Sequence, residues 1–123
     1  MREENLHKQV CNYIKLQYPN VIFNTDLSGI KLTIGQAVKL KSLRSSRAFP
    51  DLFVYEPRAC FKGFFAEFKR ETPYKKDGKL KAGEHLKEQA EMMLKLYERG
   101  YYGGFYWDFE QFKKAFDTYL KVK

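Results

Sequence analysis

The sequence predicts an α/β fold in which a mixed β-sheet is flanked by helices, with the element order α-β-α-β-β-α-β-α. Two observations support this prediction. The chain contains segments with helical apolar spacing as well as short runs rich in β-branched and aromatic residues, and these two kinds of segment alternate along the sequence. No repeat, low-complexity tract or linker interrupts the 123 residues, so we expect a single domain over residues 1–123. Aromatic residues make up 17% of the chain, which excludes disorder of the whole chain.

Four segments have the apolar spacing of amphipathic helices: residues 3–17, 34–43, 84–99 and 109–120. Pro19 ends the first helix and Gly100 the third, because proline cannot continue a helix and glycine favours a helix C-terminus. The second helix is expected to face the core through Ala37, Leu40 and Leu43. The third helix is expected to turn five residues inward: Leu86, Ala90, Met93, Leu94 and Tyr97.

Four runs have the composition of strands: residues 21–23, 51–55, 61–69 and 101–107. Residues 56–60 have the length of a hairpin connection between the second and third strands. If that hairpin turns near Ala59, Asp51 lies directly opposite Glu67. Residues 70–83 are rich in Lys, Gly and Pro, which predicts a mobile basic loop.

The charge balance predicts an anionic partner. Lysine and arginine exceed aspartate and glutamate by 23 to 15, giving a net charge of +8, and nucleic acid is the commonest partner of so basic a domain. No apolar run is long enough to span a membrane, and the N-terminal residues do not have the pattern of a secretory signal. With only Cys11 and Cys60 available for one bridge, we expect a reducing, cytoplasmic setting.

The predicted hairpin brings three charged side chains together at one strand end. Directly opposed residues have Cβ atoms roughly 5 Å apart, so the carboxylates of Asp51 and Glu67 repel each other unless a cation or proton lies between them. A hard divalent ion with oxygen ligands is the simplest solution. Lys69 projects from the same face as Glu67, because side chains alternate along a strand. Two carboxylates and an ammonium group suit metal-assisted phosphodiester hydrolysis on a basic surface.

These residues carry a family resemblance. Pro50-Asp51, followed after a hairpin by Glu67-Phe68-Lys69, resembles the PD-(D/E)XK nuclease superfamily, and more narrowly the small stand-alone VRR-NUC (virus-type replication-repair nuclease) domains of phages and prophages. Further similar pieces are spread over nearly the whole chain: residues 13–19, 28–31, 43–45 and 63–65, then His85, Gln89 and Gly100-Tyr101. A second acidic-x-Lys triplet, at residues 77–79, lies in the basic loop without apolar flanks.

The resemblance implies a restriction-endonuclease-like core and a metal-dependent endonuclease that uses Mg²⁺, with Mn²⁺ able to substitute. It implies a homodimer acting on branched DNA such as Holliday junctions, in phage replication, recombination or repair, with 5′-phosphate and 3′-hydroxyl products. It implies no nucleotide cofactor and no membrane partner, and a location in a bacterial or phage-infected cell. Two alternatives stay open: a non-catalytic nucleic-acid-binding module on the same fold, and a restriction-type nuclease acting on linear duplex.

The resemblance also assigns residues. Asp51 and Glu67 are expected to bind metal, Lys69 to position the attacking water and Gln89 to line the site. Glu3 matches an acidic position of the first helix and is expected to complete the metal shell, while His7 occupies a place where the family often has glutamine. A glycine usually stands where this chain has Ala48, which fits only if φ there is negative.

Two further sets of residues have either a functional role or an ordinary place on the protein surface. His85 lies four residues before Gln89 on one helical face, and is either an accessory site residue or a surface histidine. Several cations flank the expected site and are candidates for contacting DNA phosphates, the alternative being a solvated surface: Arg44, Arg47, Arg70, Lys75 and Lys76.

Overall fold

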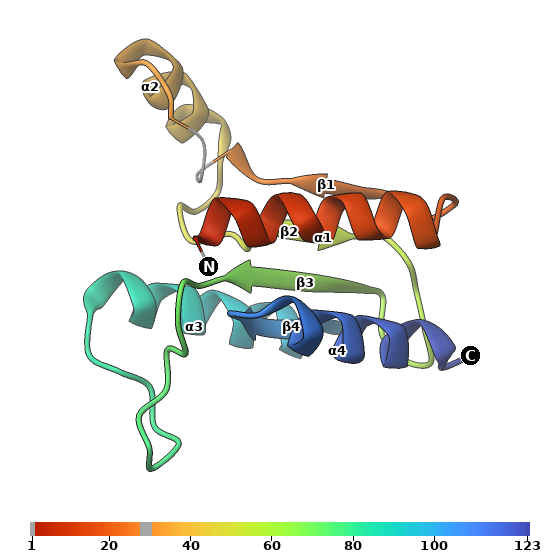
Figure 1. The fold of residues 1–123 in the computed structure, drawn as a ribbon. Helices are drawn as coiled ribbons and strands as arrows, with labels where there is room; N and C mark the ends of the chain where they lie inside the picture. The colour runs from red at the N-terminus through yellow and green to blue at the C-terminus, as the bar shows by residue number, and fades with distance from the viewer. Residues whose placement is uncertain (1, 28–30) are drawn as a thin grey trace.

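The computed structural model describes residues 2–27 and 31–123 and confirms the predicted order of elements (Figure 1). The helices are α1 (Glu3–Gln17), α2 (Ile34–Leu43), α3 (Glu84–Glu98) and α4 (Phe109–Lys121). The strands are β1 (Phe23–Thr25), β2 (Leu52–Val54), β3 (Gly63–Phe68) and β4 (Tyr101–Tyr106). The first strand begins two residues later than predicted, and most of the motif at residues 28–31 lies outside the described residues.

The strands form one mixed sheet in the order β1-β2-β3-β4. β1, β2 and β3 pair antiparallel, whereas β3 and β4 pair parallel. Leu52 lies opposite Ala66, and Val54 lies opposite Phe64, which confirms the predicted hairpin register. That register brings Asp51, one residue before β2, to the level of Glu67 on β3.

Strand β3 is buried along its whole length and separates two layers of helices. Phe64 and Phe68 pack with residues of α1 and α4 in the main hydrophobic core. Residues with the opposite parity point to the other face, where Glu67 meets Gln89 of α3. The sheet therefore has an apolar face under α1 and α4, and a face toward α3 that carries polar groups.

Two helical stripes differ from the prediction. None of the α2 residues is buried and Leu43 is 74% exposed, so the inward stripe of Ala37, Leu40 and Leu43 is wrong. Figure 1 shows the reason: α2 stands away from the sheet instead of lying on it. On α3, Leu94 and Tyr97 are exposed, because the helix is turned so that Gln89, rather than an apolar residue, reaches β3.

The connection from β3 to α3 is also more ordered than predicted. A bridge pairs Tyr74 with Leu80, and the Lys75 amide and Lys79 carbonyl hydrogen-bond at 2.8 Å. Gly78 allows the tight turn because its φ is +86°. Residues 73–81 thus form a short hairpin, which projects from the body in Figure 1. Among the described residues, no helix is long and apolar enough to cross a membrane.

Candidate active site

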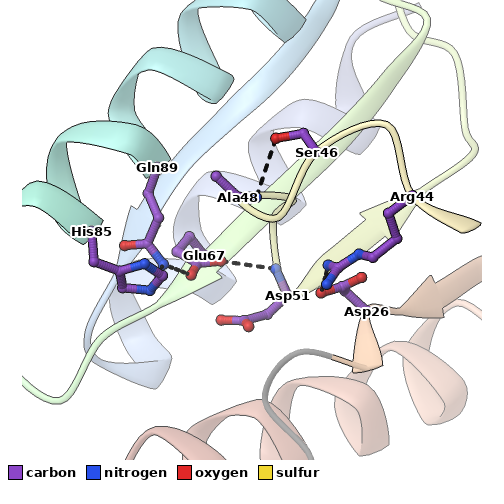
Figure 2. Close-up of polar contacts among 8 residues, drawn as sticks. All are labelled: Asp26, Arg44, Ser46, Ala48, Asp51, Glu67, His85 and Gln89. Atoms are coloured by element: carbon purple, nitrogen blue, oxygen red, sulfur yellow. Dashed lines mark hydrogen bonds and ion pairs between the residues drawn. The ribbon is translucent and has the colours of Figure 1, made fainter. Parts of the chain in front are cut away.

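The two acidic residues interlock across the ends of β2 and β3. The Asp51 amide donates to Glu67 Oε2 at 2.9 Å, and the Phe68 amide donates to Asp51 Oδ2 at 2.9 Å. Each carboxylate is therefore held by the backbone of the opposite strand, beyond the last ladder pair of the hairpin. Figure 2 shows the contact between the Asp51 amide and Glu67. The prediction that the hairpin brings Asp51 and Glu67 together is confirmed.

Burial makes the negative charge of this pair unfavourable. Burial raises the pKa of Glu67 well above its ordinary value, and the charge of Asp51 raises it further. Burial also raises the pKa of Asp51, although the Phe68 amide and the nearby His7 offset part of that effect. A cation beside both carboxylates would oppose these shifts and favour the ionised forms of Asp51 and Glu67.

Gln89 links the acidic pair to Lys69. Its side chain is 6% exposed; its Nε2 donates to Glu67 Oε1, and its Oε1 accepts from Lys69 Nζ at 2.5 Å. Lys69 Nζ also lies 5.7 Å from the centre of the Phe105 ring. One neutral amide thus fixes the carboxylate and the ammonium group on either side of itself. Gln89 was singled out from the sequence, and the structure brings it to Glu67 and Lys69.

His85 lies at the outer end of this chain of contacts. Its Nε2 is 3.2 Å from Gln89 Nε2, so it accepts the second amide hydrogen when its own proton is on Nδ1. Figure 2 shows His85 beside Gln89 on α3, on the far side of the amide from Asp51.

A cleft of about 870 Å³ opens beside Asp51, and α1 forms one of its walls. Glu3 and His7 both line it, as does Arg70. His7 Nε2 lies 3.3 Å from Thr25 Oγ1, its ring centre is 4.9 Å from that of Phe68, and burial lowers its pKa. Thr25, Asp26 and Lys31 also line this cleft. Sequence reasoning did not assign Thr25 or Asp26 to the site, and it named Lys31 only within the motif at residues 28–31, because no local pattern connects β1 to Asp51 and Glu67.

The donor set fits a hard divalent cation. Asp51 and Glu67 supply carboxylate oxygens, the ligands that Mg²⁺ prefers. Over residues 2–27 and 31–123, no group of three or more His, Cys, Asp or Glu side chains could hold a metal ion. A cation here would therefore rely on these two carboxylates, with water or backbone oxygens filling the remaining positions.

The candidate DNA-binding cations have different environments. Arg44 donates to Asp26 at 2.6 Å in a largely buried ion pair, and Arg47 makes a two-pronged ion pair with Glu88 of α3. Both arginines therefore tie the segment before Asp51 to its neighbours. Arg70 lines the cleft, while Lys75 and Lys76 are exposed on the projecting hairpin, and these three remain predictions as phosphate contacts.

Ala48 meets the condition stated above for replacing a glycine. Among the described non-glycine residues, only Ala59 has a positive φ, at 52°, so Ala48 does not need the left-handed conformation. Ala48 is buried and its amide donates to Ser46 Oγ at 3.4 Å (Figure 2).

Comparisons with known proteins show the fold. No protein-family model matches the sequence, and no curated protein does. Among solved structures, a chain described as "VRR_NUC domain protein" matches with a TM-score of 0.66 and 20% sequence identity, over 99% of this chain and 90% of that one. This chain has the fold of a VRR_NUC domain. The mixed four-stranded sheet with flanking helices is therefore a restriction-endonuclease-like α/β core, as the sequence predicted.

Proposed function

We propose that this protein is a divalent-metal-dependent endonuclease that hydrolyses phosphodiester bonds in DNA. One observation carries the proposal: Asp51 and Glu67 converge beside Lys69 at a strand end. The rest of the chain has a net charge that favours a polyanion. Carboxylates in such a place repel a phosphate unless a cation neutralises them, so a pure nucleic-acid binder gains nothing from this pair. The likeness of fold to a VRR_NUC domain protein supports the same class of enzyme.

The contacts of each residue suggest its role in the proposed reaction. Asp51 and Glu67 would hold Mg²⁺ or Mn²⁺, and their orientation is set by the two backbone amides that hydrogen-bond to them. When bound, such a cation supplies Lewis-acid activation of the phosphate and of water. The Lys69 ammonium group, which donates to Gln89, would orient the attacking water and stabilise negative charge that develops on the phosphate. Gln89 fixes the separation of Glu67 and Lys69.

The accessory residues lie around the cleft beside this pair. Glu3 is proposed as an accessory residue of the metal site, because it lines the cleft from the first turn of α1 without joining Asp51 and Glu67 in a three-residue cluster, and His7 borders the same space. Arg70 and the hairpin lysines Lys75 and Lys76 would follow the substrate backbone. Arg44 and Arg47 would support binding mainly by positioning the segment that leads into Asp51.

The proposed substrate is branched DNA, such as a Holliday junction, cut by a homodimer during phage replication, recombination or repair. This choice is what the resemblance to VRR-NUC domains implies. A restriction-type nuclease on linear duplex is the second candidate among enzymes.

A cleavage assay tests the proposal. Four-way junctions, flaps and linear duplex are incubated with the protein in Mg²⁺ or in EDTA. We expect metal-dependent cleavage that is fastest on a branched substrate, and a loss of at least about 1,000-fold in Asp51→Asn and Glu67→Gln. The Asp77→Asn variant is the matched control, because Asp77 belongs to the second acidic-x-Lys triplet, on the hairpin. This variant should cleave DNA at the normal rate.

Three outcomes would count against the proposal. Absence of metal-dependent cleavage on every substrate would leave a binding module. Full activity in Asp51→Asn would place the site elsewhere. Faster cutting of linear duplex than of any junction would favour the restriction-type alternative. Calorimetry with Mn²⁺ gives an independent readout, because Glu67→Gln should abolish a binding event that Asp77→Asn retains.

A further inference from the structure

Aromatic side chains follow Asp51 along strand β2. The backbone from residue 51 to residue 55 pairs with β1 at both of its ends: the Asp26 amide donates to the Asp51 carbonyl at 2.9 Å, and the Tyr55 amide donates to the Ile22 carbonyl at 2.8 Å. Because side chains alternate along an extended segment, Asp51, Phe53 and Tyr55 project from one face, at intervals of roughly 7 Å. The proposed metal ligand is thus followed by two rings on the same side of the sheet.

These two rings belong to a larger hollow of about 870 Å³. Its aromatic lining consists of Phe49, Phe53, Tyr55 and Tyr101, and we call it the aromatic hollow. Tyr55 is 51% exposed, and the other three side chains are half-buried. The ring centre of Phe53 lies 5.0 Å from that of Tyr55 and 5.2 Å from that of Tyr101. A cluster of contacting rings is therefore accessible from solvent.

The aromatic hollow adjoins the cleft beside Asp51. Thr25 and Asp26 line both spaces. The ion pair of Asp26 and Arg44 lies at this boundary, and Figure 2 shows it beside Asp51. The cleft, unlike the hollow, is lined by several cations: Arg2, Lys8, Lys31 and Arg70. A nucleotide has the same division into an anionic phosphate and a flat aromatic base. A phosphate in the cleft would therefore bring a neighbouring base to the aromatic hollow.

We propose that the aromatic hollow binds unpaired bases of the DNA strand whose phosphate lies beside Asp51, by stacking them on Tyr55 and Phe53. The inference rests on the proposed function and names the part of the substrate that this site takes: a single-stranded segment, such as a flap, next to the scissile phosphate. Stacking accepts any base, because every base has a flat face. Bases inside a duplex already stack on one another, so fully paired DNA would leave the hollow empty.

Tyr55 is suited to stacking because its ring is held before a ligand binds. Its hydroxyl donates to Asn24 Oδ1 at 2.7 Å, which ties the exposed side chain to β1. A side chain that is already ordered loses little rotamer freedom on binding. A second copy of the chain is the competing occupant of the hollow. DNA is favoured over it because the hollow opens into a cleft whose cations favour an anionic partner.

DNA binding in EDTA tests the inference in the absence of cleavage. The probes are a fluorescent oligothymidylate of about 12 nucleotides and a fully paired hairpin duplex, each measured by anisotropy. Tyr55→Ala should weaken oligothymidylate binding at least about 5-fold and duplex binding less than about 2-fold, because one stacked base is lost. Tyr55→Trp should retain the wild-type affinity. Tyr97→Ala is the matched control and should change neither affinity, because Tyr97 is 56% exposed on α3 and does not line the hollow.

Photo-crosslinking locates the bound base on the wild-type chain, so this readout does not depend on the folding of a variant. Irradiation of an oligothymidylate that carries one 5-iodouracil joins this base to an aromatic ring in contact with it. Peptide mass spectrometry then identifies the residue. We expect the crosslink at Tyr55 or Phe53.

The possible outcomes separate this inference from the nuclease proposal. Unchanged oligothymidylate affinity in Tyr55→Ala, equal losses for the two probes, or crosslinks only at Tyr74 and Trp107 would overturn it. A wild-type dimer that Tyr55→Ala dissociates without a change in oligothymidylate affinity would assign the hollow to a second copy and also overturn it. Single-strand binding that depends on Tyr55, without metal-dependent cleavage of any DNA, would support the inference and overturn only the proposed function.

Discussion

Gly103→Ala should disrupt the pairing of the edge strand β4 with β3. Gly103 on β4 lies directly opposite Phe65 on β3. A Cβ atom at Gly103 would lie 1.9 Å from the carbonyl oxygen of Phe65 and 2.7 Å from its carbonyl carbon, whereas real Cβ contacts under 3.0 Å are essentially never seen. Both atoms belong to the backbone of a buried strand, so no change of rotamer relieves the clash. The two strands must move apart by about an ångström.

The cost follows from that displacement. Overpacking costs about 1–3 kcal/mol, and a weakened ladder hydrogen bond adds about 1 kcal/mol, so we expect a loss of about 2–4 kcal/mol in the free energy of unfolding. With an m-value of about 1.5 kcal/mol/M, the urea midpoint should fall by about 1.3–2.7 M. The mutant should fold, since typical domains have about 5–15 kcal/mol of stability.

Gly104→Ala is the matched control on the neighbouring residue. A Cβ atom there meets nothing within 4 Å, and the φ of Gly104 is not positive. Its urea midpoint should stay within about 0.3 M of wild type or rise slightly, because alanine lowers the entropy of the unfolded chain. Equal midpoints for Gly103→Ala and Gly104→Ala would refute the reasoning, since both replace glycine with alanine in one strand and differ only in the clash.

Two further predictions concern the helix layer and the hairpin. The hydroxyls of Tyr13 and Tyr18 both donate to Asp117 Oδ1; burial alone would raise the pKa of Asp117, but these donors hold it below its ordinary value. Asp117→Asn should therefore cost about 1 kcal/mol at pH 7, and the difference from wild type should disappear as the pH falls below about 4 and the carboxylate becomes protonated, as measured by urea unfolding at several pH values. Lys75→Gln/Lys76→Gln should lower DNA affinity and reduce the slope of log Kd against log salt by about 2, as measured by fluorescence anisotropy. The charge-matched Lys95→Gln/Lys121→Gln should leave that slope unchanged, and equal slopes for the two double variants would remove the hairpin from the DNA-binding surface.

The geometry of the site could be predicted because it depends on short-range regularities. A five-residue connection and the two-residue period of strands are sufficient to place Asp51 opposite Glu67 and Lys69 on the same face. Gln89 comes from a separate helix, so only the family resemblance connected it to the site. Its contact with Glu67 also explains why the expected inward stripe of α3 was partly wrong.

The position of α2 could not be predicted from spacing alone. Periodicity shows which residues share a helical face, but it does not show what that face contacts. Leu40 and Leu43 were assigned to the core because they are apolar, whereas within residues 2–27 and 31–123 they border a hollow that this chain leaves open. The basic hairpin was missed for a related reason: its order depends on one bridge and on the contacts of Tyr74 with Phe105 and Trp107, which are distant in sequence.

The parallel pairing of β3 and β4 determines which part of this protein can be exchanged. Parallel neighbours require a long crossover, and here the hairpin of residues 73–81 lies within it, between Lys69 and the start of α3. Its length does not set the register of any strand, because β4 is aligned by its ladder with β3. The hairpin can therefore be shortened, lengthened or replaced by another basic loop while Asp51, Glu67 and Gln89 keep their places. The proposed DNA-contacting hairpin and the proposed metal site can thus be altered independently of each other.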